Sequence, residues 1–212
     1  SKSMYSSAAL DVYKRDDSSL DDLNRLVSKS IEDKEIAMAA FLDIEGAFNN
    51  VTTNSLVNAM NKRGAPTIID TWISATLENR TVISTLGQAT IKARAGGGCP
   101  QGGVLSPLLW ATLVDDLLNE LSINDFYCLG YADDIVIVVK GKFAGVISDR
   151  MQIALNIVDN WCQQERLTVN AQKTQIVNFT KIKTVLKGLK PLALGGTEVA
   201  FAKDLKYLGI FF

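Results

Sequence analysis

Residues 129–139 read Leu-Gly-Tyr-Ala-Asp-Asp-Ile-Val-Ile-Val-Val, which sets two adjacent acids between two apolar segments. The flanking segments, 126–131 and 135–139, have the composition of β-strands, and residues 132–134 are expected to join them. Adjacent carboxylates at the end of a buried sheet repel each other, and their desolvation costs several kcal/mol unless a partner neutralises them. A solvated hairpin turn explains the same pair, because Asp is common in turns.

A third acid favours a neutralised carboxylate cluster at the end of a sheet over a solvated turn. Residues 36–44 form another apolar run, and Asp43 stands at its C-terminal end. If the two strands are neighbours, Asp43, Asp133 and Asp134 converge at one edge of the sheet. Such a cluster is stable near neutral pH only if some acids are protonated or if cations bind between them.

The composition limits which cations and which chemistry can be involved. The 212 residues include no histidine and carry a formal charge of −1, so Ser-His-Asp catalysis and His-ligated zinc are excluded. The three cysteines, Cys99, Cys128 and Cys162, are far apart and odd in number, which argues against a disulfide framework. Oxygen-seeking cations, Mg²⁺ first, are therefore expected, and two such ions suit phosphoryl or nucleotidyl transfer.

The order of the expected elements predicts an α+β domain. Helices are expected from Ser18, over 53–63, from Pro66 as a first-turn proline, after an N-cap at Ser106, and over 146–161. Strands are expected in the hairpin 81–86 and 90–95, among residues 169–179, and over 206–212. Because helices and strands do not alternate strictly, one antiparallel sheet is favoured over a doubly wound one. No apolar run reaches the ~18 to 20 residues of a membrane span, so no membrane partner is expected.

Three further features carry weaker signals. The glycine-rich loop 96–103 could cradle phosphate through backbone N–H groups, and Gln101 within it needs an explanation beyond a plain surface loop. Phe48 is either a core side chain or a wall beside a bound sugar. The segment 166–197 has basic residues and no acid, and it is either a solvated face or a track for a phosphate backbone.

Five stretches in this order resemble the motifs of reverse transcriptases, closest in wording to non-LTR retrotransposons of the jockey-like, LINE type. Residues 41–51 (Phe-Leu-Asp-Ile-Glu-Gly-Ala-Phe-Asn-Asn-Val) resemble motif A, 100–109 (Pro-Gln-Gly-Gly-Val-Leu-Ser-Pro-Leu-Leu) motif B, and 131–134 motif C. Residues 167–174 resemble motif D, and 205–209 motif E, the primer grip. The resemblance covers nearly the whole chain and implies a right-hand polymerase palm with part of the fingers and no thumb.

The resemblance also implies roles for individual residues. Asp43, Asp133 and Asp134, with the Ile44 carbonyl as a further ligand, would hold two Mg²⁺ ions, for which Mn²⁺ could substitute. Lys173 would be the general acid for pyrophosphate. Ala47, Phe48, Gln101 and Gly102 would line the nucleotide pocket, with Phe48 as the steric gate against a ribose 2′-hydroxyl. Lys206 and Tyr207 would support the primer end.

The implied organisation is a reverse transcriptase domain fragment over residues 1–212. Residues 1–35 and 65–98 would be fingers-like, and 36–64 and 99–212 would run from the palm through the primer grip. An RNA template, a DNA primer, dNTPs and the rest of a retrotransposon polyprotein are the implied partners, with nuclear action in target-primed reverse transcription. An upstream fingers segment and a downstream thumb are expected outside these residues, so the chain alone is expected to be incomplete for activity.

Two other functions remain open from the sequence. A viral RNA-dependent RNA polymerase palm generally carries a second Asp near the sugar, whereas Ala47 and Phe48 stand in that region here. A palm relic that binds nucleic acid or protein without catalysis would have no use for the three acids, because an unpaired carboxylate cluster costs stability.

Overall fold

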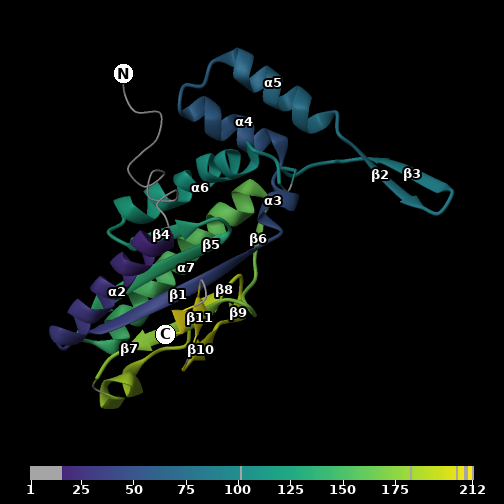
Figure 1. The fold of residues 1–212 in the computed structure, drawn as a ribbon. Coiled ribbons are helices and arrows are strands. Elements are labelled where there is room, and N and C mark those ends of the chain that lie inside the picture. Colours follow the sequence, from purple (N-terminus) through teal and green to yellow (C-terminus); the bar gives the residue numbers. More distant parts are fainter. Residues whose placement is uncertain (1–15, 101, 182, 204, 208–209, 212) are drawn as a thin grey trace.

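The computed structural model describes residues 16–100, 102–181, 183–203, 205–207 and 210–211 (Figure 1). Its helices are α2 (Asp16–Glu32), α3 (Ala47–Asn50), α4 (Thr53–Lys62), α5 (Thr67–Glu78), α6 (Ser106–Ile123) and α7 (Ala144–Glu165), with a 3₁₀ helix, η1, at Lys183–Gly188. Its strands are β1 (Ile36–Glu45), β2 (Thr81–Leu86), β3 (Ala89–Arg94), β4 (Tyr127–Tyr131), β5 (Asp134–Gly141), β6 (Thr168–Val169), β7 (Gln175–Phe179), β8 (Ala193–Leu194), β9 (Thr197–Glu198), β10 (Ala200–Ala202), β11 (Lys206–Tyr207) and β12 (Ile210–Phe211).

A six-stranded sheet forms the centre of the molecule. Its order is β10-β7-β1-β5-β4, and β6 pairs with the last residues of β1. The pairs β1–β5, β1–β7 and β4–β5 are antiparallel, and β10 joins β7 in parallel. The α+β class and the antiparallel-dominated sheet expected from the sequence are thus confirmed.

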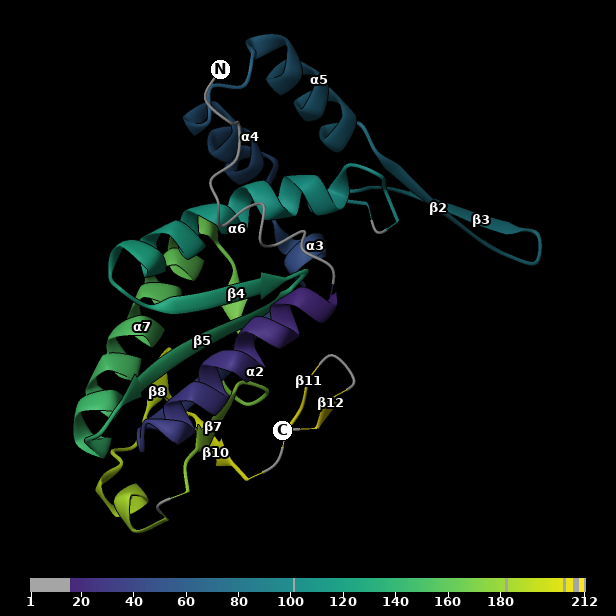
Figure 2. The same ribbon diagram turned by 60° about the vertical axis from the view of Figure 1, so that its left-hand side comes forward.

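Strand β1 is buried on both faces, which explains why its sequence reads as a continuous apolar run. Met38, Ala40 and Leu42 belong to the large core shared with α6 and α7. The alternate residues Ala37, Ala39 and Phe41 pack in a second core with Leu23 and Val27 of α2. Figure 2 shows the resulting layers, with α2 on one face of the sheet and α7 on the other.

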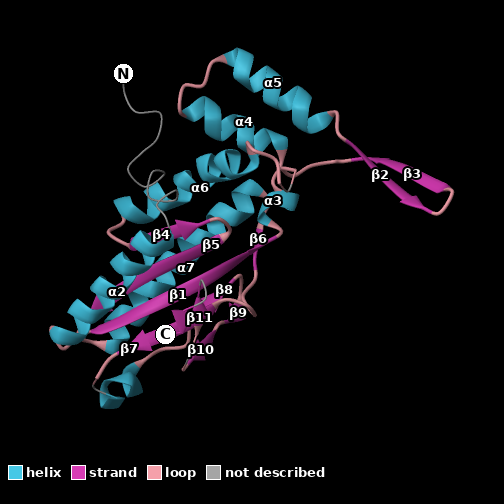
Figure 3. Ribbon diagram, in the orientation of Figure 1, coloured by secondary structure: helices cyan, strands magenta, loops and turns pink. Residues whose placement is uncertain are grey.

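Helices α4 and α5 and the β2–β3 hairpin extend away from this body. Helix α4 packs on α6, α5 packs on α4, and the hairpin projects beyond them, as the strands in Figure 3 show. Both hairpin strands are exposed along their whole length. None of the helices in the described ranges is long and apolar enough to cross a membrane.

Several local expectations need correction. Helix α2 begins at Asp16, two residues before the expected start at Ser18. Ser106 is the first helical residue of α6 and not its N-cap, because its hydroxyl donates instead to the Pro100 carbonyl at 2.7 Å. Pro66 is the N-cap of α5, and Asp134 is the first residue of β5 and not part of the turn.

The two C-terminal strand expectations also change. Residues 169–179 form two short strands, β6 and β7, because a turn at 170–174 separates them. Within 206–212 the described residues form β11 and β12, which pair with each other instead of making one strand.

Candidate active site

Two of the predicted acids face each other across the central strands. Asp43 of β1 and Asp134 of β5 are direct partners in the antiparallel register. Direct partners point to the same face of a sheet, with Cβ atoms about 4.5–5.5 Å apart. By strand alternation this is the face on which Phe41 and Val136 pack against α2. The two strands are neighbours, as predicted, and they bring Asp43 and Asp134 together.

The third acid lies on the turn between β4 and β5. Tyr131 pairs with Asp134, so Ala132 and Asp133 form a two-residue connection. Ala132 has φ 51°, a left-handed conformation that is uncommon for a residue with a Cβ. The indole nitrogen of Trp110 donates to the Ala132 carbonyl at 2.6 Å, which fixes this turn against helix α6. Asp133 itself is exposed.

The electrostatics of Asp134 reflect this crowding. Burial, followed by repulsion from Asp133 and from Asp43, raises the pKa of its carboxyl to about 6. One oxygen of Asp43, Oδ2, is buried without a hydrogen-bond partner. The arrangement therefore holds more negative charge than its protein neighbours neutralise.

These residues fit a divalent cation by their donor chemistry. The donors are carboxylate oxygens, which are the ligands that Mg²⁺ and Mn²⁺ prefer. A cation would also relieve the repulsion in the Asp43–Asp134 pair and satisfy the buried Asp43 oxygen. In the described residues, however, no three acidic or thiol side chains are grouped closely enough to hold a metal ion. The fit therefore rests on the opposed pair.

The predicted general acid lies beside this pair. The Lys173 ammonium is 3.4 Å from Asp43 Oδ2, and its side chain is 66% exposed. The two groups form an ion pair without a hydrogen bond.

Asn170 holds the turn that carries Lys173. Its backbone N–H donates to the Asp43 carbonyl at 2.8 Å, and its side-chain amide donates to Glu45 at 2.6 Å. Its side-chain oxygen accepts the backbone N–H groups of Gln172 and Lys173, both at 3.0 Å. Asn170 lies in the segment that resembles motif D, and no role was predicted for it. Asn favours turns because its side chain bonds to the backbone two residues further on, which is a signal that could have indicated this turn.

Phe48 is brought to the same end of the sheet by α3. Its ring packs at 5.7 Å between centroids against Trp110, so one tryptophan contacts both Phe48 and the turn that bears Asp133. Trp110 was also missed, because a tryptophan in an apolar helix gives no sequence signal beyond core packing. Ala47 and Ile44 are buried beside Phe48, and Ile44 pairs with Val169 of β6.

The glycine-rich loop packs its backbone onto α3. The N–H of Gly98 donates to Val51 at 2.8 Å, and the N–H of Cys99 donates to Phe48 at 2.6 Å. Gly98 has φ 78°, and a Cβ there would lie 2.5 Å from the Asn49 carbonyl oxygen, so this position requires glycine. The loop therefore sets the backbone position of Phe48.

Among the other predicted positions, Gly102 is exposed with φ 80°, and Gln101 lies outside the described residues. Lys206 and Tyr207 form β11, paired with β12. In the basic segment, Lys190 pairs with Asp149 at 2.6 Å, so this cation is partly neutralised within the chain.

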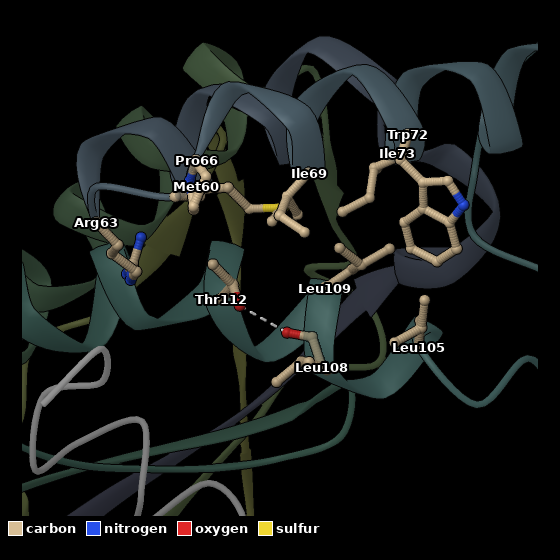
Figure 4. A pocket seen from close by; sticks show the side chains of 11 residues that line it. Met60, Arg63, Pro66, Ile69, Trp72, Ile73, Leu105, Leu108, Leu109 and Thr112 are labelled. Carbon is tan, nitrogen blue, oxygen red and sulfur yellow. Dashed lines mark hydrogen bonds between the residues drawn. The ribbon is translucent and has the colours of Figure 1, made fainter.

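A separate apolar pocket of about 290 Å³ lies between α4, α5 and α6. Figure 4 shows Met60, Ile69 and Trp72 around it, with the Thr112 hydroxyl turned to the Leu108 carbonyl at 2.7 Å. None of the predicted site residues lines this pocket.

Comparisons with known proteins show what this chain is similar to. A family model described as reverse transcriptase (RNA-dependent DNA polymerase) matches residues 9–212. The RNA-directed DNA polymerase from the mobile element jockey of Drosophila melanogaster is 29% identical over 89% of this chain and 21% of that protein. A putative 115 kDa protein in the type-1 retrotransposable element R1DM of the same species is 27% identical over 83% of this chain and 17% of that protein. The chain thus spans about a fifth of the length of these relatives.

Solved structures share the fold at low sequence identity. Apo telomerase from Candida tropicalis, truncated from its C-terminal domain, aligns with a TM-score of 0.57 at 16% identity. The alignment covers 76% of this chain and 35% of that one. This likeness shows the polymerase palm fold.

Proposed function

This chain belongs to the reverse transcriptase (RNA-dependent DNA polymerase) family, and from this premise we propose what its acidic strand end does. In this proposal the chain is the catalytic part of a non-LTR retrotransposon polymerase, which adds dNTPs to a primer 3′-hydroxyl on an RNA template. The observation that supports this is the Asp43–Asp134 pair, opposed in register with one buried oxygen that accepts no hydrogen bond. A structural protein would have no reason to keep two repelling carboxylates at this point.

Asp43, Asp133 and Asp134 would hold Mg²⁺, with the Ile44 carbonyl as a further ligand and Mn²⁺ able to substitute. Two ions held there would supply Lewis-acid chemistry, which lowers the pKa of an attacking hydroxyl and offsets the charge that develops on a leaving pyrophosphate. The number and identity of the ions are part of the proposal. Metal dependence itself is general for the family.

Lys173 is proposed to give a proton to the pyrophosphate oxygen that leaves. Its ammonium lies beside Asp43, and its exposure leaves it free to turn from that carboxylate to a new anionic group. Asn170 keeps the Lys173 backbone at this end of the sheet through its two accepted N–H bonds.

Phe48 is proposed as the wall that excludes a ribose 2′-hydroxyl, with Ala47, Gln101 and Gly102 completing the nucleotide pocket. The contact of Phe48 with Trp110 supports this, because it ties the ring to the turn that bears Asp133. Lys206 and Tyr207 are proposed to support the primer end. Residues 65–98 would serve as fingers, and the rest of the polyprotein would supply further contacts to template and primer in the nucleus.

The test is primer extension by the full-length parent protein on an RNA template with a DNA primer, dNTPs and Mg²⁺. Asp134→Asn should lower the rate by about 10³-fold, because it removes a charge from the proposed metal site. Asp149→Asn, which removes a carboxylate from an exposed pair with Lys190, is the matched control and should keep the activity. Activity that survives Asp134→Asn, or a full-length parent without activity, would contradict the proposal.

Phe48→Ala separates this proposal from an RNA-dependent RNA polymerase. If the ring is a steric gate, its removal admits ribonucleotides while the rate with dNTPs falls less. Unchanged sugar selectivity would remove the assignment of Phe48.

A further inference from the structure

Arg80 makes a set of contacts that no sequence motif indicates. It follows α5 and precedes β2, at the base of the projecting hairpin. Its Nη2 donates to the carbonyls of Gly97 and Gly98, at 2.6 Å each, and its Nε donates to Leu77 at 3.0 Å. Its own carbonyl accepts from the Ala95 N–H at 3.0 Å.

These bonds join three segments that the sequence separates. Leu77 lies in the last turn of α5, where carbonyls lack helical partners and favour a cation. Ala95 follows β3 at the other side of the hairpin stem. Gly97 and Gly98 belong to the loop that leads to motif B. One half-buried guanidinium therefore fixes the end of α5 and the start of this loop together.

The same loop segment presses on the element that carries Phe48. Gly98 and Cys99 donate to the carbonyls of Val51 and Phe48, so the loop is held from both sides. On one side is the Arg80 guanidinium, and on the other is α3. A loss of the Arg80 bonds would free the loop and with it the backbone of Phe48.

We propose that Arg80 is a positioning residue for the nucleotide pocket, which fixes Gly97 and Gly98 so that the loop holds Phe48 at the sugar. This inference rests on the function proposed above. Lysine cannot replace arginine here, because a single ammonium cannot reach three carbonyls with the planar fork of a guanidinium.

Arg94 offers a matched control on the same stem. It also donates to carbonyl oxygens, those of Glu78 at 3.2 Å and of the Asn79 side chain at 3.3 Å, but it does not bond to the glycine loop. Arg80→Lys and Arg94→Lys each keep the charge and remove one guanidinium from the hairpin base.

The first measurement uses this chain and needs no catalysis. Cys99 lies in the loop and is 2% exposed, and Cys162 is 1% exposed in the body. Arg80→Lys should raise the rate of Cys99 alkylation by iodoacetamide about tenfold, measured by peptide mass spectrometry, while Cys162 stays protected. Arg94→Lys should leave both rates near those of the wild type. Protection of Cys99 in Arg80→Lys would overturn the proposal.

The second measurement uses the full-length parent. Arg80→Lys should raise the KM for dNTPs about tenfold, lower kcat less, and reduce the preference for dNTPs over ribonucleotides. Gly98→Ala, which drives a Cβ into the α3 carbonyls with Arg80 intact, should reduce the same preference. Gly98→Ala also replaces Arg80→Lys as the test variant if Cys162 becomes reactive in Arg80→Lys, because that reactivity would mean that the body has unfolded.

The outcomes separate the two proposals. Unchanged KM and sugar preference in both variants would overturn the positioning role while leaving the polymerase proposal intact. A parent without Asp134-dependent activity would overturn the polymerase proposal and the nucleotide role of Arg80 with it, whereas Cys99 alkylation would still report whether the guanidinium holds the loop.

Discussion

The middle and the end of the β1–β5 pair share one backbone ladder but differ in what their side chains do. In the middle, Ala40 faces Ile137, and both are fully buried in the core. Three residues further along β1, Asp43 faces Asp134. Burial stabilises the fold at the first position and works against an ionised group at the second. Burial in the middle of the strand pair thus offsets the unfavourable charges at its end.

The largest expected effect on stability comes from the middle of the pair. Ile137→Ala should lower the free energy of unfolding by about 2–5 kcal/mol, because it removes buried methyl groups and leaves a cavity. Urea unfolding followed by circular dichroism measures this. Ile91→Ala, on the exposed hairpin, is the control and should change it by less than about 0.5 kcal/mol. Equal effects would contradict the division between core and hairpin.

At the end of the pair, a substitution should raise the free energy of unfolding instead of lowering it. Burial and the neighbouring acids hold the pKa of Asp134 at about 6, above its ordinary value of 3.8. Between these two values the folded chain binds more protons than the unfolded chain, so stability falls as pH rises through this window. Asp134→Asn should therefore stabilise the metal-free chain by about 1–3 kcal/mol at pH 8.

The gain from Asp134→Asn should shrink as the pH falls through this window and disappear below about pH 3, where the carboxyl is protonated in both states. Urea unfolding in the presence of a chelator, at about pH 3 and at pH 8, measures the difference. A loss of stability at pH 8 would contradict the claim that Asp134 is an unfavourable charge in the fold. The same substitution is expected to lower the polymerisation rate by about 10³-fold, so the acid that costs stability is the one that the proposed function needs.

The same comparison explains what the sequence could predict. Residues 36–42 and 135–139 are apolar without a break because both faces of their strands are covered, so their strands and the neighbouring acids could be predicted. The contacts of Arg80 and Trp110 could not, because their partners are backbone carbonyls 17 to 22 residues away in the chain. A carbonyl gives no sequence signal, since every residue carries one.

The predicted ends of two elements were wrong for a related reason. Ser106 followed by Pro107 has the pattern of an N-cap, yet the Ser106 hydroxyl bonds to Pro100 across the loop. Tertiary contact overrides the local preference there. Asp134 was expected in a turn, and its pairing with Asp43 made it the first residue of a strand.

The smallest expected effect concerns the cation beside the acidic pair. Lys173→Met should lower the stability of the metal-free chain by less than about 1 kcal/mol, because an exposed ion pair contributes little. Lys190→Met, in the exposed pair with Asp149, is the control and should behave alike in urea unfolding. A cost of several kcal/mol would make Lys173 a structural partner of Asp43 and argue against its role as a proton donor.

The central claim is that the opposed acids form a cation site, and a Mg²⁺ titration of thermal stability tests it most directly. At ten times its dissociation constant, Mg²⁺ should stabilise the wild-type chain by about 1.4 kcal/mol, because it binds the folded state. Asp149→Asn should respond like the wild type, and Asp134→Asn should not respond. A wild-type chain that Mg²⁺ leaves unchanged, or an equal rise in Asp134→Asn, would contradict the claim.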